Sequence, residues 1–260
     1  MAIHPTAIIG PNVEIHPEAS IEPYVVITGQ VKIGRKTKVE SFVRIGADQG
    51  KITIGEENLI LSGACLGGIP QDLSYKGENT ELVIGDRNTI REYVTMNLGT
   101  NKENGITKVG NDNLIMAYVH IAHDCQIANN VVLANSLQLA GHVRIADYAR
   151  IGGMVGITQF TRIGRHAYVA ADSTINKDIP PFTIAQGRWA RVRAANKIGI
   201  ERAGFSKDEV DKINRAVRAL IMGERTIEEA IQKITEECLP STNVEELIQF
   251  IRASEQGIAR

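Results

Sequence analysis

An aliphatic residue recurs at every sixth position through most of the chain, and this repeat restricts the possible folds more than any other feature. Every sixth residue from 3 to 45 and from 109 to 175 is Ile, Val or Leu. A period of six matches neither an amphipathic helix nor a series of hairpins. It fits one short strand and one turn per hexad, with the aliphatic side chain pointing into a narrow core.

Three hexads would complete a triangular coil of 18 residues, so residues 18 apart would lie above one another. Successive coils would pair as parallel strands about 4.8 Å apart. The expected fold is therefore mainly β, a parallel β-helix with the shape of a triangular prism. Interruptions of the period near 46–53, 67–83 and 97–108 are expected to leave the coils as loops, and such loops are commonly functional.

The six-residue period ends near residue 180, and a helical pattern follows. Two Ser/Thr-x-x-Glu pairs, at 206–209 and 226–229, fit capping boxes and precede apolar residues at helical spacing. We therefore predict a β-helix over residues 1–187 and a small helical C-terminal domain over residues 188–260. The open coil ends and flat faces of a prism favour self-association.

Composition excludes several classes of protein. The formal net charge is −1, which does not favour nucleic acid or an anionic membrane as a bulk partner. No basic-then-apolar segment stands at the N-terminus and no run of 18 apolar residues occurs, so neither secretion nor a membrane span is expected. Three widely separated cysteines do not form a disulfide framework. A cytoplasmic protein is the expectation.

One turn of the repeat combines a histidine with an acid, His123 and Asp124. The third and fourth places of a hexad fall on the outer side of the prism. Gly141 and His142 follow 18 residues later, and Gln159 another 18 after Gly141. These five residues are predicted to form one exposed ladder along an edge of the prism.

This ladder has the groups needed for general-base acyl transfer. The imidazole of His123 can take a proton from an alcohol or amine that attacks a thioester. Asp124 can orient the ring and favour the imidazolium, and the N–H of Gly141 can hold the oxyanion. Cys125 falls in an inward column of the repeat, which predicts a buried packing role instead of a nucleophile.

Other interpretations of the cluster remain open at this point. One is a zinc site, because three imidazoles, those of His120, His123 and His142, would be neighbours, as in the trimeric β-helix zinc enzymes of the carbonic anhydrase type. Their spacing is a weak zinc signature. Polar residues are also common on β-helix turns, and a histidine there need have no chemical role. A scaffold that binds a nucleotide sugar without transfer is a further alternative.

The whole chain, helical tail included, resembles the UDP-N-acetylglucosamine O-acyltransferases of bacterial lipid A biosynthesis. The repeat alone would indicate only an acyltransferase-like solenoid, whereas the motifs are specific as a set. The matching stretches are 70–73, 84–88, 120–125, 139–143, 151–154, 159–160, 178–181 and 203–206.

The resemblance implies a left-handed β-helix that forms a homotrimer with active sites between subunits. It implies transfer of a (3R)-hydroxyacyl chain from acyl carrier protein to the glucosamine 3-OH of UDP-N-acetylglucosamine, the first step of lipid A biosynthesis. No metal or organic cofactor is implied.

The resemblance also assigns roles to single residues. His123 matches the catalytic base, Asp124 the orienting acid and Gly141 the oxyanion N–H. Substrate-contacting positions correspond to Asp72, His120, His142 and Gln159, nucleotide-holding positions to Asn196 and Arg202, and a position near the end of the acyl channel to Ala171.

Five departures from the family pattern surround the expected sugar and nucleotide sites. They are Ser74 and Ala203 in place of basic residues, Asn97 and Thr158 in place of histidines, and Ile198 in place of an acid. They leave the reaction type intact and raise the alternative of a 3-amino sugar acceptor, which would give an amide instead of an ester.

Overall fold

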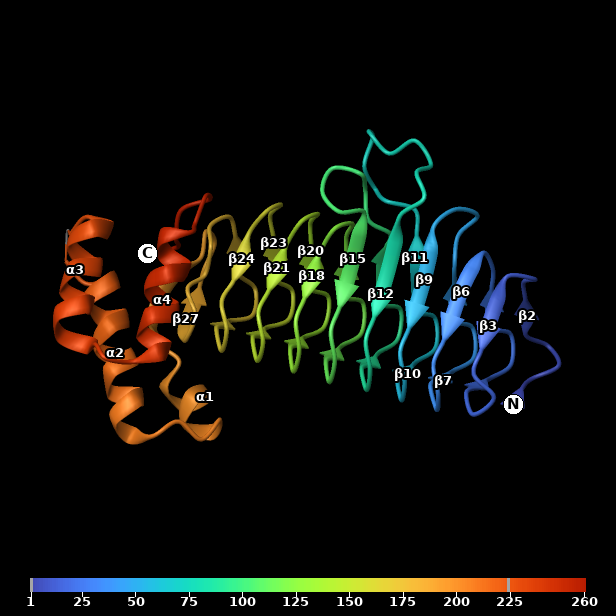
Figure 1. Ribbon diagram of the computed structural model, residues 1–260, viewed down its shortest axis with the longest axis horizontal. Coiled ribbons are helices and arrows are strands. Elements are labelled where there is room, and N and C mark those ends of the chain that lie inside the picture. The colour runs from blue at the N-terminus through green and yellow to red at the C-terminus, as the bar shows by residue number, and fades with distance from the viewer. Residues whose placement is uncertain (1, 224) are drawn as a thin grey trace.

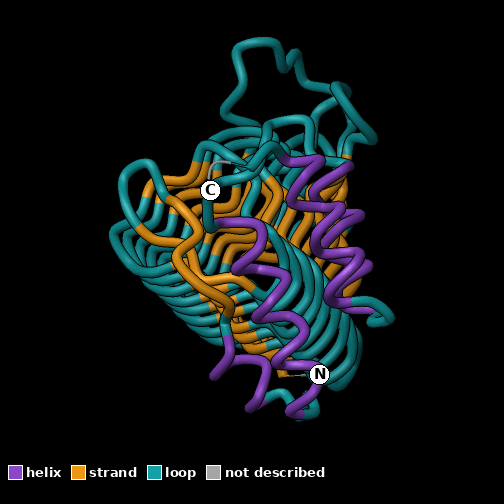
Figure 2. The backbone as a smooth tube through the Cα atoms, turned by 90° about the vertical axis from the view of Figure 1, so that its left-hand side faces the viewer, coloured by secondary structure: helices purple, strands orange, loops and turns teal. Residues whose placement is uncertain are grey.

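The computed structural model describes residues 2–223 and 225–260. Three mostly parallel sheets form the walls of an elongated prism, and a cluster of helices lies at its C-terminal end (Figure 1). Viewed along the prism, the coils superimpose as a stack, and two long loops rise from one corner (Figure 2). The predicted fold, a left-handed parallel β-helix followed by a small helical part, is confirmed.

The strands alternate among the three walls, here called sheets A, B and C. Sheet A contains β1 (Ala2–Ile3), β4 (Ser20–Ile21), β7 (Lys38–Val39), β10 (Leu59–Ile60), β13 (Thr89–Ile90), β16 (Leu114–Ile115), β19 (Val132–Leu133), β22 (Arg150–Ile151), β25 (Tyr168–Val169), β27 (Thr183–Gln186) and β28 (Arg191–Ala195). Sheet B contains β2 (Ile8–Ile9), β5 (Val26–Ile27), β8 (Arg44–Ile45), β11 (Cys65–Gly68), β14 (Thr95–Asn97), β17 (His120–Ile121), β20 (Gln138–Leu139), β23 (Gly156–Ile157) and β26 (Thr174–Ile175). Sheet C contains β3 (Val13–Ile15), β6 (Gln30–Ile33), β9 (Lys51–Ile54), β12 (Glu81–Ile84), β15 (Ile106–Val109), β18 (Gln126–Ile127), β21 (Arg144–Ile145) and β24 (Arg162–Ile163).

The register follows the 18-residue spacing wherever no loop intervenes. His120 of β17 pairs with Gln138 of β20, and Gln138 pairs with Gly156 of β23. The aliphatic residue of each hexad points inward, and Ile121 is fully buried. Burying one such side chain contributes roughly 1.5–3 kcal/mol, so a column of them favours this register over a slip that would turn the column outward.

All three interruptions of the repeat leave the prism at the corner where sheet B passes to sheet C. The connecting segments are 46–50, 69–80 and 98–105. They are shorter than predicted because β9, β12 and β15 take up the last residues of the predicted ranges, and β11 and β14 take up the first residues of the second and third. The turn that carries His123 and Asp124 lies between β17 and β18, which is the same corner one coil further on.

The turns at this corner use left-handed backbone conformations. Asp124, His142 and Phe160 occupy the same place in three successive coils, with φ of 62°, 63° and 64°. Such values are uncommon for residues other than glycine. Because 18 non-glycine residues of the described chain share the conformation, it belongs to the coil geometry and is not strain specific to one site.

The transition to the helices lies later than the predicted division at residue 187. Residues 191–195 form β28, which pairs antiparallel with β27 and extends sheet A. The helices follow as α1 (Lys197–Arg202), α2 (Lys207–Ile221), α3 (Ile227–Cys238) and α4 (Thr242–Arg252). The division of the chain into two domains stays a prediction.

The helix starts agree with the capping signals in part. Thr226 and Glu229 form a complete capping box at α3. At α2, Ser206 accepts the N–H of Glu209, while the Glu209 carboxylate turns away to Ser241 and Asn243. Arg165 on the prism bonds Glu246 of α4 at 2.7 Å, which ties the helices to the last coils. No helix in the described part of the chain is long and apolar enough to cross a membrane.

Candidate functional site

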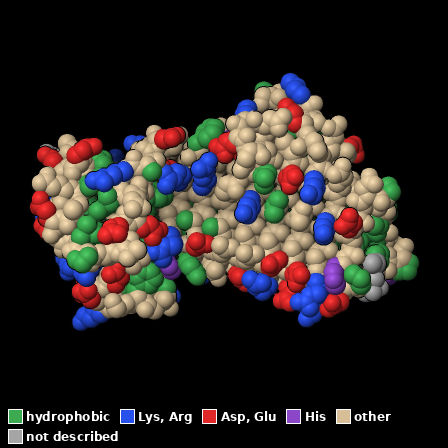
Figure 3. All heavy atoms as spheres, in the orientation of Figure 1, with side chains coloured by type: hydrophobic (Ala, Val, Ile, Leu, Met, Phe, Trp, Pro, Cys, Tyr) green, Lys and Arg blue, Asp and Glu red, His purple; other side chains and the backbone are tan. Residues whose placement is uncertain are grey.

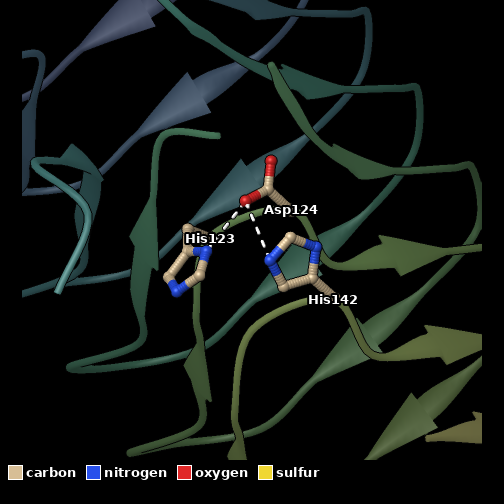
Figure 4. A group of neighbouring side chains, drawn as sticks. All are labelled: His123, Asp124 and His142. Carbon is tan, nitrogen blue, oxygen red and sulfur yellow. Dashed lines mark hydrogen bonds and ion pairs between the residues drawn. The ribbon is translucent and has the colours of Figure 1, made fainter. Parts of the chain in front are cut away.

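The imidazole of His123 is held by the carboxylate of its neighbour. His123 Nδ1 lies 2.8 Å from Asp124 Oδ2 (Figure 4). An Nδ1–H donated to this oxygen places the lone pair of the neutral ring on Nε2. The pair therefore has the arrangement of a general base whose orientation is fixed by an acid.

Asp124 is itself fixed by two threonines of the neighbouring coil. The N–H of Thr100 donates to Asp124 Oδ1 at 2.8 Å, and the Thr100 hydroxyl donates to Oδ2 at 2.7 Å. The backbone N–H of Asp124 donates to Thr107 Oγ1 at 2.8 Å. Burial by itself raises the pKa of Asp124, but the hydrogen bonds from His123 and Thr100 outweigh it and lower the pKa. Asp124 is therefore a buried carboxylate that stays ionised.

The prediction that this ladder is exposed is wrong for most of its members. His123 and His142 are each 3% exposed, Asp124 is fully buried, and Gly141 is buried. Only Gln159 is exposed. The reason is that segments 69–80 and 98–105 fold over the corner, so groups that a bare prism would present to solvent are covered.

Gly141 lies directly against the ring of His123. A Cβ at Gly141 would come within 2.4 Å of His123 Cε1 and 2.7 Å of Nε2. A side chain at this position would push the ring away, so the close approach requires glycine. Among the described residues, no protein group accepts the N–H of Gly141.

His142 lies on the other side of Asp124. Its Nε2 is 3.6 Å from Asp124 Oδ2 (Figure 4). Its Nδ1 is 3.4 Å from Glu103 Oε1. The ring stacks on Phe160 with centroids 4.5 Å apart. Asp124 therefore lies between two imidazoles, of which only His123 makes a short hydrogen bond.

Asp72 reaches the free nitrogen of His123 from segment 69–80. Its Oδ2 lies 3.9 Å from His123 Nε2 and 2.6 Å from Lys102 Nζ. The N–H and hydroxyl of Ser74 both donate to Oδ1 at 2.8 Å. Hydrogen bonds from Lys102 and Ser74 hold the pKa of Asp72 well below its usual range. Ser74, one of the departures noted above, is thus a direct partner of this carboxylate.

Two residues flank the His123–Asp124 pair, called the dyad below. His120 makes a polar contact, whereas Cys125 is packed in the core. His120 Nδ1 bonds the Thr95 hydroxyl at 2.8 Å, and burial, with the charge of His123, lowers the His120 pKa. Cys125 is fully buried, as predicted, and burial raises its pKa to about 12. Cys125 is therefore a packing residue with no accessible thiolate.

A groove of about 860 Å³ runs along sheet C from Val83 of β12 to α4. Glu103, His142 and Phe160 are among its lining residues, and Phe250 of α4 lines its C-terminal end. His123 and Asp72 are not among its lining residues. His142, which does line the groove, lies 3.6 Å from Asp124.

Asn196 and Arg202 lie elsewhere, in a cavity of about 1170 Å³ beneath α1. This cavity also contains Arg150, Arg165 and Lys197, so its lining is strongly basic. None of the dyad residues lines it. Asn196 caps α1 and donates from Nδ2 to the carbonyl of His166 at 2.9 Å. Within a single chain, the predicted nucleotide-binding residues therefore lie apart from the predicted base.

Ala171, the remaining predicted residue, lies at the prism surface. Ala171 is exposed, and its backbone packs against Gly152, where a Cβ would come within 2.4 Å of the Ala171 nitrogen. The structure does not bring Ala171 into either cavity. Asn97 is buried and donates to the carbonyl of Ile69 at 2.9 Å, so it holds the base of segment 69–80.

His123, Asp124 and His142 have ligand atoms close enough to hold a metal ion, all within 4.8 Å of one another. His120, the third histidine of the zinc interpretation, is not part of this group. Asp124 Oδ2 already accepts hydrogen bonds from His123 and Thr100. Metal ligation through this oxygen would replace the bonds that orient the ring, so the observed geometry fits a dyad better than a metal site.

Thr100, Lys102, Glu103 and Thr107 are site residues that the sequence analysis missed. All four lie in the predicted interruption 97–108, where no period assigns side-chain directions. One signal was present, because counting hexads places that interruption at the same corner as His123, one coil earlier. The position of the loop was predictable, but its contacts were not.

Comparisons with known proteins agree with this geometry. Residues 178–259 match the model of domain 2 of UDP N-acetylglucosamine O-acyltransferase, and residues 106–141 match the bacterial transferase hexapeptide model. The chain is 44% identical over 258 residues, 99% of each chain, to the acyl-[acyl-carrier-protein]–UDP-N-acetylglucosamine O-acyltransferase of Thermodesulfovibrio yellowstonii.

Solved structures give the same result. The UDP-N-acetylglucosamine O-acyltransferase of Moraxella catarrhalis superimposes with a TM-score of 0.95 at 39% identity, covering 100% of both chains. The Arabidopsis UDP-N-acetylglucosamine acyltransferase gives a TM-score of 0.89 at 29% identity over 99% of this chain and 100% of that one. The chain belongs to the family of acyl-[acyl-carrier-protein]–UDP-N-acetylglucosamine O-acyltransferases.

Proposed function

We propose that this protein transfers an acyl chain from the thioester of acyl carrier protein to the 3-OH of UDP-N-acetylglucosamine. The observation that carries the proposal is the His123–Asp124 pair, whose geometry leaves Nε2 as the free basic atom. The names of the full-length relatives supply both substrates. In finer detail, the chain transferred is a (3R)-hydroxyacyl group, and the reaction is the first step of lipid A biosynthesis in the cytoplasm.

In the proposed step, His123 Nε2 takes the proton of the sugar hydroxyl as its oxygen bonds to the thioester carbon. Asp124 stabilises the imidazolium that forms. The N–H of Gly141 stabilises the negative charge on the carbonyl oxygen. The C–S bond then breaks, and the proton passes from His123 to the departing thiolate. The sequence of bonds requires no metal or organic cofactor.

The other residues bind substrate in this proposal. Asp72, His120, His142 and Gln159 contact the sugar and the acyl donor around the base. Asn196 and Arg202 hold the nucleotide, because their basic cavity suits a diphosphate. Ala171 lies at the end of the acyl chain. Since these groups lie apart within a single chain, the working site is assembled between subunits of a homotrimer.

Product analysis tests the reaction. Purified protein is given UDP-N-acetylglucosamine and a mixed pool of (3R)-hydroxyacyl carrier proteins, and the product is examined by mass spectrometry. An O-acylated UDP-sugar is expected. His123→Ala should lower kcat by about 10²–10⁴-fold while the protein keeps its circular dichroism spectrum. Undiminished turnover in His123→Ala would contradict the assignment of the base.

The alternatives are separated by the same preparation. A 3-amino acceptor would give an amide, which hydroxylamine does not cleave, whereas the ester is cleaved. Stoichiometric zinc in elemental analysis would support the hydratase alternative. Nucleotide-sugar binding without product would support a non-catalytic scaffold. Full-length relatives that are named as O-acyltransferases favour the ester.

A further inference from the structure

The carboxylate of Asp72 lies between the ammonium group of Lys102 and the free nitrogen of His123. Lys102 Nζ is 2.6 Å from Asp72 Oδ2, and the same oxygen is 3.9 Å from His123 Nε2. The two charged residues come from different loops, 98–105 and 69–80, which project together from one corner of the prism (Figure 1). Both positive and negative side chains mark this projection on the molecular surface (Figure 3).

The orientation of Asp72 leaves one oxygen for the reacting region. Oδ1 is occupied by the N–H and hydroxyl of Ser74. Oδ2 therefore faces Lys102 and His123. The side chain of Asp72 is 12% exposed and that of Lys102 is 51% exposed, so the pair lies where a buried site opens to solvent. A substrate group that approaches Nε2 meets a neutralised carboxylate instead of a free negative charge.

Other charged groups near the dyad have other partners. Glu103, the next residue after Lys102, lies 3.4 Å from His142 Nδ1 and 3.3 Å from Arg144. Lys76 belongs to the same loop as Asp72 but directs its Nζ to the carbonyl of Leu73 at 3.1 Å. Among the described residues, Lys102 is thus the lysine paired with Asp72.

The charge beside Nε2 matters because the two kinds of acceptor differ in charge. A sugar hydroxyl is neutral until its proton passes to His123. An amine is largely a cation near neutral pH, when its pKa resembles that of an α-amino group, about 7.7–8.0. Its nitrogen also gains positive charge as the C–N bond forms, before a proton passes to His123 and then to the departing thiolate. A free carboxylate would attract this cation, whereas a carboxylate paired with an ammonium group does not.

We propose that Lys102 is a specificity-determining residue that favours a hydroxyl acceptor over an amino acceptor by neutralising Asp72 beside the base. The inference rests on the proposed acyl transfer. In this proposal the contact between Lys102 and Asp72 favours the ester product. Loop 98–105 then selects the nucleophile, whereas the dyad carries out the proton transfer.

Acceptor competition tests the role. Native protein, Lys102→Met, Lys102→Arg and Lys76→Met are assayed with one acyl carrier protein donor. Each is given UDP-N-acetylglucosamine or its 3-amino-3-deoxy analogue, and kcat/KM is measured for both. Lys102→Met should raise the amine-to-hydroxyl ratio of kcat/KM about three- to fivefold, the upper part of the range expected for a half-exposed charge pair. Lys102→Arg keeps the charge and Lys76→Met removes a lysine that does not contact Asp72, so both should stay within about twofold of native protein.

A ratio is used because damage to folding lowers the rate with both acceptors and leaves the ratio unchanged. If native protein is active and the ratio in Lys102→Met equals the native ratio, the role of Lys102 is wrong and the proposed function stands. If native protein acylates neither acceptor, the proposed function is wrong and the role of Lys102 falls with it. Raised discrimination against the amine in Lys102→Met would also contradict the proposal.

Discussion

The side chains of His123 and Asp124 meet at 2.8 Å although the two residues are adjacent in the sequence. In a regular strand, successive side chains point to opposite faces. Here Asp124 has a φ of 62°, and the turn brings both side chains to the same side of the corner. Asp124 is therefore placed by the coil geometry, and the dyad needs no partner from a distant element.

Replacing Asp124 by Asn tests what the acid contributes. The amide keeps the size of the side chain but loses the negative charge that holds the proton on His123 Nδ1. We expect kcat to fall by about 10³–10⁴-fold with little change in KM, as in other His–Asp pairs. Steady-state kinetics with UDP-N-acetylglucosamine would measure this. A tenfold loss or less would show that Asp124 only fills space.

Gly141→Ala tests the close packing against His123. The added methyl would lie 2.4 Å from His123 Cε1, so the ring must shift away from its present position. We expect transfer to fall at least tenfold, because small displacements of a reacting group are costly. Gly156→Ala is the matched control, since a Cβ at Gly156 meets nothing within 4 Å. Equal activity of the two variants would contradict the packing argument.

His166 is expected to make the stability of the protein depend on pH. Burial, followed by the charges of Arg165 and Arg150, lowers its pKa to about 4 from an ordinary value of 6.5. The unfolded chain therefore binds a proton between pH 6.5 and 4 that the folded chain does not. Stability is complete above pH 6.5 and decreases as the pH falls toward 4, by on the order of 3 kcal/mol.

A phenylalanine at this position isolates the effect. His166 stacks on Tyr148 with centroids 4.8 Å apart, and His166→Phe keeps an aromatic ring there but cannot titrate. Urea unfolding of both proteins between pH 4 and 7.5, at one protein concentration, gives the difference. We expect the native curve to lose more stability with falling pH than the variant curve. Parallel curves would show that another group is responsible.

The repeat predicted the fold well because one physical requirement is renewed in every hexad. Each coil must bury its aliphatic residue, and Ile121 or Leu133 can do so in only one register. The same counting placed Gly141 above His123. It could not predict that His123 would be buried, because loop conformation has no period. Lys102 and Thr100 approach the dyad from a loop whose contacts depend on tertiary packing alone.

Mixing two inactive variants tests whether the site is assembled between subunits. The base lies at the B–C corner, whereas Arg202 lines a basic cavity that contains no dyad residue. If the two work across an interface, His123→Ala and Arg202→Ala damage different sides of each site.

Co-expressed in equal amounts, the two variants should form mixed oligomers in which about a quarter of the interfaces have two intact sides. Transfer activity should return to about that fraction of native activity, whereas the variants purified separately stay inactive. The control is a double variant that carries both His123→Ala and Arg202→Ala, because none of its interfaces has an intact side. Mixed oligomers confirmed by two different affinity tags but without recovered activity would show that each chain holds its own complete site.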